Sequence, residues 1–236
     1  MILIAIPARL KSTRLEKKAL APIGKYPMLW WTWQKAKLSQ LAQRVIIATD
    51  SQEIFNLMSS YGAECIMTSE DCQSGSDRIY EACQFIPEAE IIVNLQGDEP
   101  LMKPEVLDGC INTLLQNNDC QIATVACPFL EEEDFKNPNN VKVVFNSSGR
   151  ALYFSRAPMA GAYLHIGLYA YKKNSLEAFC KMEVSRLEKM EKLEQLRALE
   201  AGFSIYIHQI NLSTEKHFGV DTQADLELAR KILTLQ

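Results

Sequence analysis

The first half of the chain alternates short apolar runs with segments of helical periodicity. Short apolar stretches predict strands over 2–6, 45–49, 64–67, 90–95 and 121–127. The first is a continuous apolar run, the pattern of a strand that is buried on both faces of a parallel sheet, and the run over 90–95 is nearly all apolar as well. Helices are expected between them, beginning at Pro27 and then covering 51–61, 74–85 and 104–115. This alternation predicts an α/β fold with a mostly parallel sheet flanked by helices.

Turn and capping residues set the ends of several of these elements. Asp50 with Glu53 three residues later predicts a capping box for the helix over 51–61, and Gly62 is suited to the position just beyond that helix. Thr222 and Asp225 have the same spacing and predict the start of a C-terminal helix.

The alternation of predicted strands and helices changes in the second half of the chain. Two runs joined by a turn at 146–149 predict an antiparallel hairpin over 141–145 and 151–155, and a further strand is expected over 165–171. An amphipathic helix is predicted through 187–199, followed by a strand over 203–210. We therefore expect one domain spanning 1–236, with an antiparallel insertion at about 141–171.

Composition narrows the class of protein. The chain has 236 residues, a net charge of −4 and seven cysteines without C-x-x-C spacing. A net acidic chain makes a general nucleic-acid surface improbable, and the scattered cysteines argue against a zinc site or a disulfide framework. No apolar run approaches the roughly 20 residues of a membrane span, and no signal peptide is visible, so a cytoplasmic location is expected.

A local excess of positive charge follows the first predicted strand. Arg9, Lys11, Arg14, Lys17 and Lys18 all lie within about a dozen residues of Pro7. Open α/β sheets bind ligands at the carboxyl ends of their strands, so these cations suggest a site for a ligand with several phosphates. The alternative interpretation is a solvated basic loop with no ligand.

Two carboxylates occupy comparable positions later in the chain. Asp98 follows the strand over 90–95, and Asp221 follows a strand-like segment just before the C-terminal helix. Carboxylates at such ends are suited to Mg²⁺, although Asp98 could equally form a turn and Asp221 a helix cap. Basic and acidic strand ends together suggest nucleotidyl transfer. The sequence contains no G-x-x-x-x-G-K-[ST] or G-x-G-x-x-G loop, which disfavours a P-loop ATPase or a dinucleotide-binding enzyme.

The sequence resembles one family along its whole length, that of the 3-deoxy-manno-octulosonate (Kdo) cytidylyltransferases, or CMP-Kdo synthetases. The motifs that carry the resemblance are IPARLKSTRL with Lys18, ATD at 48–50, SGSDR at 74–78, VNLQGDEP at 93–100, ALYFSRAP at 151–158, HIGLYAY at 165–171, LEQLRAL at 193–199 and VDTQADLE at 220–227. The first is shared with other sugar nucleotidyltransferases, whereas the combination is more specific.

The resemblance implies a Rossmann-like nucleotidyltransferase fold with a small antiparallel dimerisation region. It implies transfer of CMP from CTP to Kdo with Mg²⁺, release of pyrophosphate, a role in lipopolysaccharide synthesis, and a homodimer. By position it assigns catalysis to Lys18, Asp98 and Asp221, the metal to Asp98 and Asp221, the nucleotide to Arg9, Arg14, Lys18, Ser74, Gly75 and Arg78, and the acidic sugar to Gln96, Arg156, His165, Glu194 and Gln195.

Several alternatives stay open at this point. The segment Met159–Leu164 is shorter than the family's usual connection, so a Kdo analogue such as the 8-amino sugar, or another 2-keto acid sugar, is the second candidate substrate. A catalytically silent nucleotide-binding protein is the third hypothesis. Read without the resemblance, His165 is more often a structural histidine, and Glu194 and Gln195 would be solvated surface residues.

Overall fold

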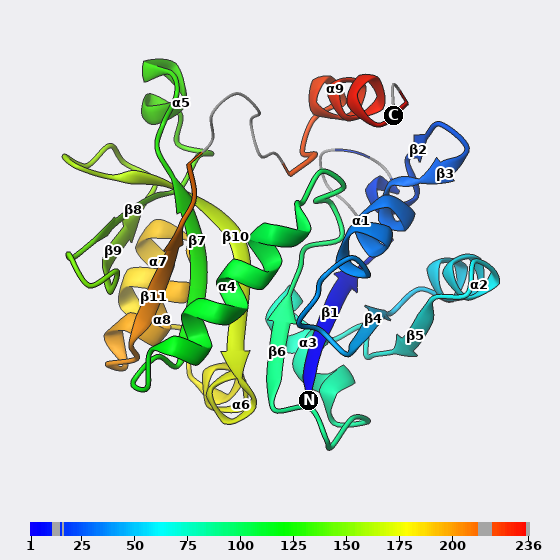
Figure 1. Ribbon diagram of the computed structural model, residues 1–236, viewed down its shortest axis with the longest axis horizontal. Coiled ribbons are helices and arrows are strands. Elements are labelled where there is room, and N and C mark those ends of the chain that lie inside the picture. Colours follow the sequence, from blue (N-terminus) through cyan, green and yellow to red (C-terminus); the bar gives the residue numbers. More distant parts are fainter. Residues whose placement is uncertain (11–14, 16, 212–218, 235–236) are drawn as a thin grey trace. The chain divides into compact units, whose positions relative to one another are not determined.

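The computed structural model describes residues 1–10, 15, 17–211 and 219–234. The chain forms two compact units, one from Met1–Asp108 with His217–Gln236 and the other from Gly109–Lys216. The sequence of the second unit is thus inserted into that of the first. The elements of both units are labelled in Figure 1.

The first unit is built on a parallel sheet with strand order β6-β1-β4-β5. Its strands are β1 (Ile2–Ala8), β4 (Arg44–Thr49), β5 (Glu64–Met67) and β6 (Ile91–Asn94), with a small antiparallel pair, β2 (Pro22–Ile23) and β3 (Tyr26–Pro27), outside the sheet. Strand β1 is central, and Leu3 to Ile6 are fully buried, as its apolar run predicts.

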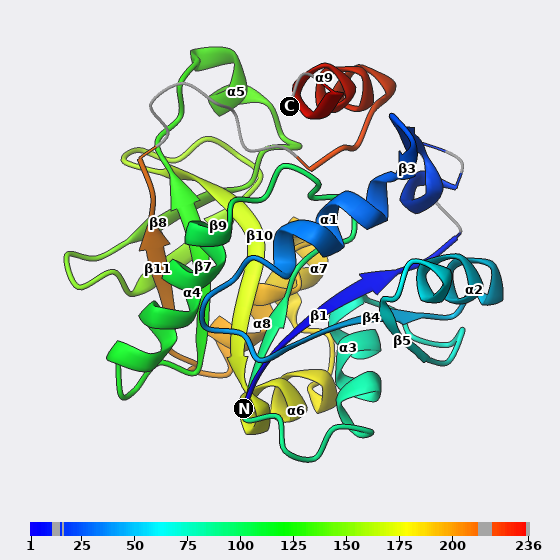
Figure 2. The same cartoon turned by 45° about the vertical axis from the view of Figure 1, so that its right-hand side comes forward.

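Helices cover both faces of this sheet. They are α1 (Met28–Ala36), α2 (Gln52–Ser60) and α3 (Gly75–Cys83), with a short 3₁₀ helix, η1 (Lys18–Leu20), before β2 and the last helix, α9 (Gln223–Thr234), after the second unit. Right-handed crossovers put α1 on one face and α3 on the other, as Figures 1 and 2 show on either side of β1.

The second unit contains a mixed sheet. Strand β7 (Ile122–Cys127) pairs in parallel with β11 (Ile205–Gln209) and antiparallel with β10 (Tyr163–Lys172). Strands β8 (Lys142–Phe145) and β9 (Ala151–Ser155) form the predicted antiparallel hairpin, and β8 also pairs with β10. The predicted α/β fold with helices around a largely parallel sheet is confirmed.

The helices of this unit differ partly from expectation. They are α5 (Glu132–Lys136), α6 (Lys173–Lys181), α7 (Arg186–Glu191) and α8 (Gln195–Glu200), together with most of α4 (Pro104–Gln116), which begins in the first unit. The single helix predicted through 187–199 is wrong, because Lys192 adopts a left-handed conformation with φ 55° and ends α7. Helices α5 and α6 were not predicted.

The capping box predicted at Asp50 is also wrong. Ser51 is the residue that caps α2, and its hydroxyl accepts a hydrogen bond from the backbone N–H of Ile54 at 3.3 Å. Asp50 instead pairs with Arg78 on α3. The box predicted for the last helix is confirmed, since Thr222 and Asp225 exchange side-chain and backbone hydrogen bonds.

Across the described residues, no helix combines the length and the apolar character needed to cross a bilayer.

Candidate functional site

Three charged side chains from distant parts of the sequence meet in the first unit. The ammonium of Lys18, in η1, donates hydrogen bonds to Asp98 Oδ2 and, at 2.9 Å, to Asp221 Oδ1. Lys18 and Asp98 are largely shielded from solvent, while the side chain of Asp221 is 42% exposed. The convergence predicted for these three residues is therefore present in the structure.

Packing of the last helix explains how Asp221 reaches this position. Leu226, Ala229 and Leu233 of α9 are buried in one apolar cluster with Ile23 of β2 and Met28 of α1. Val220 joins the same cluster, and its backbone N–H donates to the carbonyl of Asp98 at 2.9 Å. Burial of this apolar surface thus holds the start of α9 against the loop after β6.

The surroundings perturb the protonation of two groups in this cluster. Burial alone would lower the pKa of Lys18, but the charges and hydrogen bonds of Asp98 and Asp221 outweigh it and leave the pKa raised. Burial, followed by the charges of Asp98 and Asp221, raises the pKa of Glu99 to about 8. The cluster therefore contains two carboxylates beside an ammonium, and a third carboxyl group that favours its neutral form at pH 7.

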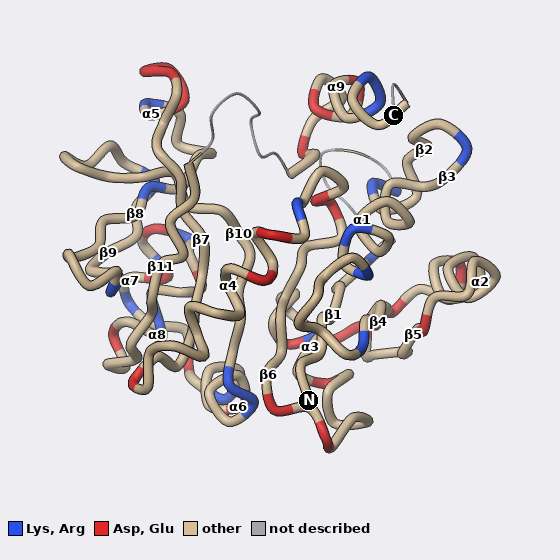
Figure 3. Tube along the Cα trace, viewed as in Figure 1, with Lys and Arg blue, Asp and Glu red and all other residues tan. Residues whose placement is uncertain are grey.

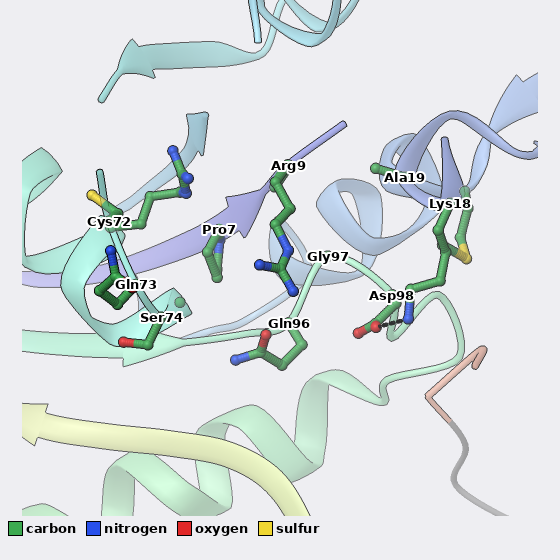
Figure 4. Close-up of a pocket in the computed structure, with 14 residues that line it drawn as sticks. Pro7, Arg9, Lys18, Ala19, Cys72, Gln73, Ser74, Gln96, Gly97 and Asp98 are labelled. Carbon is green, nitrogen blue, oxygen red and sulfur yellow. Dashed lines mark hydrogen bonds and ion pairs between the residues drawn. The ribbon is translucent and has the colours of Figure 1, made fainter. Parts of the chain in front are cut away.

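A pocket adjoins this cluster at the carboxyl ends of β1 and β6. Its lining includes Pro7, Arg9, Lys18, Gln96 and Asp98. Figure 4 shows the side chain of Arg9 extending toward the loop that carries Gln96 and Asp98. Figure 3 shows that blue Lys and Arg positions and red Asp and Glu positions both occur along the described trace of each unit.

The start of α3 forms another wall of the pocket. The hydroxyl of Ser74 is engaged in a capping box, in which it accepts from the backbone N–H of Asp77 at 3.1 Å and donates to the Asp77 carboxylate at 2.9 Å. A Cβ at Gly75 would lie 3.2 Å from Pro7 Cγ and 3.5 Å from the amide of Gln96. Glycine therefore keeps this part of the wall open.

Arg78 also lines the pocket, but its guanidinium is engaged within the protein. It is only 4% exposed and donates to the Asp50 carboxylate at 2.7 Å and to the Thr68 hydroxyl at 2.6 Å. These bonds tie α3 to the ends of β4 and β5. Direct contact between Arg78 and a nucleotide stays a prediction, as it does for Ser74, and Arg14 lies outside the described residues.

Of the five residues assigned to the sugar, only Gln96 belongs to the first unit. Its amide donates to Asn94 Oδ1 at 3.2 Å. The others, Arg156, His165, Glu194 and Gln195, belong to the second unit. Gln195 is buried at 4% exposure, so it is not the solvated helix residue that its sequence context suggested.

The turn between α7 and α8 organises the candidates in the second unit. Arg156 donates from Nε to the carbonyl of Glu191 at 3.0 Å, and from Nη2 to that of Lys192 at 3.4 Å. Glu194 lies two residues beyond Lys192, close enough to Tyr169 for its charge to add to burial in raising the pKa of that phenol. The ring of His165 lies 5.5 Å from that of Tyr169.

His165 is buried at 9% exposure on β10. Burial lowers the pKa of its imidazole to about 3, so the ring is neutral near pH 7. Its Nε2 lies 2.9 Å from the hydroxyl oxygen of Thr124 on β7. The histidine is thus a fixed, uncharged polar group rather than a proton carrier.

Comparisons with known proteins agree with this arrangement. A family model described as Cytidylyltransferase matches residues 3–217. The chain belongs to the cytidylyltransferase family. It is 42% identical over 234 residues to a 3-deoxy-manno-octulosonate cytidylyltransferase of Leptospira biflexa, covering 96% of this chain and 94% of that one. It is 44% identical over 241 residues to the protein of the same name from Chlorobium limicola, covering 98% and 96%.

Solved structures give the same result for the cytidylyltransferase fold. The chain is similar to a CMP:2-keto-3-deoxy-manno-octonic acid synthetase complexed with CTP, with 33% identity, a TM-score of 0.92, and coverage of 99% and 98% of the two chains. A 4-diphosphocytidyl-2C-methyl-D-erythritol synthase from Anaerococcus prevotii, at 14% identity and a TM-score of 0.66, shares the fold.

This cytidylyltransferase has a donor set that fits a magnesium ion. Asp98 and Asp221 reach the same ammonium, so both carboxylates are directed at one position of positive charge. Within the described ranges, no group of three or more His, Cys, Asp or Glu side chains is arranged to hold a metal. Mg²⁺ needs no such group, because it takes one or two carboxylates and completes its shell with water and phosphate oxygens.

Three features of the cytidylyltransferase site were not singled out from the sequence. Glu99 was passed over although it follows Asp98 directly, and its burial beside two carboxylates appears only in the fold. The sequence predicted Asp50 as a helix cap. Its pairing with Arg78 was missed, because that contact joins the end of β4 to α3 and leaves no local pattern. Thr124 could have been noticed from the sequence, because it is a hydroxyl residue inside an otherwise apolar strand.

Proposed function

We propose that this cytidylyltransferase transfers CMP from CTP to 3-deoxy-manno-octulosonate, forming CMP-Kdo and pyrophosphate. The observation that carries the proposal is the near-full-length similarity to proteins named for this reaction, at 42–44% identity. The convergence of Lys18, Asp98 and Asp221 beside a pocket supplies a suitable arrangement of charge. The relatives are named for Kdo, which favours it over the 8-amino analogue.

In the proposed reaction, the anomeric hydroxyl oxygen of the sugar bonds to the α-phosphorus of CTP. The bond from that phosphorus to the bridging oxygen breaks, pyrophosphate leaves, and the hydroxyl proton passes to solvent. Lys18 and Arg9 line the pocket and would hold the phosphate oxygens as negative charge shifts toward the leaving group. Holding both reactants in place supplies the remaining acceleration, and no covalent enzyme intermediate is needed.

Asp98 and Asp221 would hold Mg²⁺, which neutralises phosphate charge when it is bound. Once a cation and a triphosphate are present, Lys18 can exchange one of its carboxylate partners for a phosphate oxygen. The two aspartates then balance the charge of the metal while Lys18 and Arg9 balance that of the nucleotide.

In the second unit, Arg156 is the candidate partner for the carboxylate of the sugar. Its guanidinium is oriented by three backbone carbonyls, those of Pro138, Glu191 and Lys192. Planar guanidinium groups favour carboxylates in paired geometry, and a guanidinium held in one orientation loses less entropy on binding. Glu194, Gln195 and His165 would satisfy sugar hydroxyls.

The proposal includes a cytoplasmic homodimer that serves lipopolysaccharide synthesis, as the family resemblance implies. Light scattering of the purified protein tests the dimer, for which we expect twice the chain mass of 26.7 kDa. A monomer at micromolar concentration would contradict it.

The enzymatic proposal is tested by pyrophosphate release from CTP. Kdo, its 8-amino analogue and sialic acid are compared at equal concentrations, with Mg²⁺ and with excess EDTA. We expect release with Kdo that depends on Mg²⁺. Faster release with either other sugar would overturn the substrate assignment, and full activity in EDTA would overturn the metal assignment. Tight CTP binding without turnover of any sugar would favour a silent binding protein.

A further inference from the structure

Thr124 is a fully buried hydroxyl residue in the middle of β7, between the apolar residues Ala123 and Val125. Its hydroxyl oxygen lies 2.7 Å from the carbonyl oxygen of Leu168, 3.3 Å from that of Ile166 and 2.9 Å from Nε2 of His165. All of these groups belong to the second unit. The hydroxyl is therefore hydrogen-bonded although it is fully buried, as buried polar groups generally are.

The two carbonyls lie at an irregularity of β10. The register between β10 and β7 shifts between Ile166 and Tyr169, so β10 carries extra residues opposite Thr124. A bulge of this kind leaves backbone groups without a partner in the sheet. The Thr124 hydroxyl donates to the backbone carbonyls at this bulge. It also lies beside His165, which precedes the bulge.

The hydrogen-bonding partners of Thr124 determine whether Nε2 of His165 donates or accepts. A hydroxyl has one hydrogen and two lone pairs, and a carbonyl oxygen can only accept. The Thr124 hydrogen must therefore point to the bulge carbonyls, with Leu168 O the nearer. If it pointed to His165 instead, two oxygen atoms 2.7 Å apart would face each other without a hydrogen in a buried site. The Thr124 oxygen thus accepts, and His165 Nε2 donates.

The other ring nitrogen is then an acceptor. The imidazole is neutral near pH 7 and carries a single proton, which the contact with Thr124 assigns to Nε2. Nδ1 therefore has a lone pair, and none of the described residues hydrogen-bonds to it. The ring is confined by Phe154, whose centroid lies 5.0 Å away in an edge-to-face arrangement.

We propose that Thr124 is a positioning residue that fixes His165 as its Nε2–H tautomer and thereby presents Nδ1 to the sugar as a hydrogen-bond acceptor. This inference rests on the proposed function, since it assigns one contact of the acidic sugar. It has a consequence for specificity, because the substrate must place an O–H or N–H group at His165. A sugar with hydrogen or a methyl ether at that position would leave Nδ1 unpaired and would bind more weakly.

The test compares Thr124→Val, which removes the hydroxyl at nearly constant size, with Thr124→Ser, which keeps it. Nitrogen-15 NMR of His165 near pH 7 reports which ring nitrogen carries the proton. Steady-state kinetics report the KM for CTP, the KM for Kdo and kcat. The matched control is Val125→Ala, because Val125 is equally buried on the same strand but faces the other side of the sheet.

We expect wild-type His165 to carry its proton on Nε2. Thr124→Val should lose that preference and raise the KM for Kdo about tenfold, as expected for one hydrogen bond, with the KM for CTP unchanged. Thr124→Ser should restore both the tautomer and the KM. Val125→Ala should lower thermal stability without changing the tautomer or the KM for Kdo.

Two results would overturn the inference: a proton on Nδ1 in the wild-type protein, or an unchanged KM for Kdo in Thr124→Val. A Thr124→Val protein that fails to fold does not remove the test, since the wild-type tautomer and the response to Thr124→Ser are measured separately. Failure of the proposed function is recognised independently, because wild-type protein would then release no pyrophosphate with Kdo.

Discussion

Replacing Asp221 by Asn should separate catalysis from folding. The change removes one negative charge from the group that faces Lys18 and keeps the size and polarity of the side chain. Asp221 is 42% exposed and Lys18 retains Asp98, so the lost ion pair accounts for less than about 1 kcal/mol of unfolding free energy. The box formed by Thr222 and Asp225 still caps α9.

The effect on turnover should be much larger. If Asp221 holds the cation that balances the triphosphate, its loss removes a charge interaction at the point where negative charge develops. Losses of single groups of this kind reduce kcat by roughly 10²–10³, or about 3–4 kcal/mol. The activation free energy should therefore change by several times more than the stability.

The assays are pyrophosphate release at saturating CTP and Kdo, and urea unfolding followed by circular dichroism. Glu227→Gln is the control, because it removes the same charge from an exposed position on α9, the helix that follows Asp221, and should change neither quantity. A kcat within tenfold of wild type in Asp221→Asn would refute the metal assignment. A loss of more than about 3 kcal/mol of stability would refute the view that the pair is mainly functional.

Three further perturbations test other parts of the molecule. Leu226→Ala, in the cluster that anchors α9, should cost about 2–5 kcal/mol of stability in urea unfolding, and a loss below 1 kcal/mol would contradict the role of that packing. Because the pKa of His165 is lowered to about 3 in the folded state, its stabilising contribution is present above about pH 6.5 and is lost as pH falls toward 3. This contribution, measured as the difference in unfolding free energy between wild type and His165→Gln, should be about 2 kcal/mol smaller at pH 5 than at pH 7.5, and an equal difference at both pH values would contradict the lowered pKa. Lys142 is fully buried and donates to the carbonyls of Asn137, Asn140 and Arg156, so Lys142→Met should lower stability and raise the KM for Kdo more than that for CTP, whereas equal changes in both KM values would count against a link to Arg156.

Much of the fold follows from local pattern. The strands over 2–8, 44–49, 91–94 and 122–127 are largely buried, as their apolar runs require, and the hairpin at 142–155 follows from its turn residues. The strand over 64–67 is present but only partly buried, because β5 is the last strand in the order β6-β1-β4-β5. The errors arose where a tertiary contact decided the outcome. Asp50 has the properties of a helix cap, but Arg78 competes for its carboxylate, and Ser51 is able to replace it as the cap.

The break between α7 and α8 has the same origin. The amphipathic pattern continues through 187–199, and neither glycine nor proline interrupts it. The helix ends because the carbonyls of Glu191 and Lys192 turn toward Arg156, which lies more than thirty residues earlier in the chain. The hydrophobic periodicity of 187–199 gives no information about this contact with Arg156, so the end of α7 could not be predicted from it.

The candidate site was predictable only in part, and for a related reason. Lys18, Asp98 and Asp221 could each be noticed as charges at strand ends, but their convergence depends on the packing of α9 against β2 and α1. The role of Thr124 depends on a bulge on a neighbouring strand, which the sequence of β7 does not reveal.

The discontinuous first unit has a consequence for how the enzyme is made. As the chain leaves the ribosome, Lys18 and Asp98 emerge early, whereas Asp221 emerges only after the whole inserted unit has been synthesised. A nascent chain therefore cannot assemble the complete charge centre until α9 docks. Activity therefore depends on synthesis of the chain through α9, and products that stop before Asp221 would be catalytically inert however well their first sheet had formed.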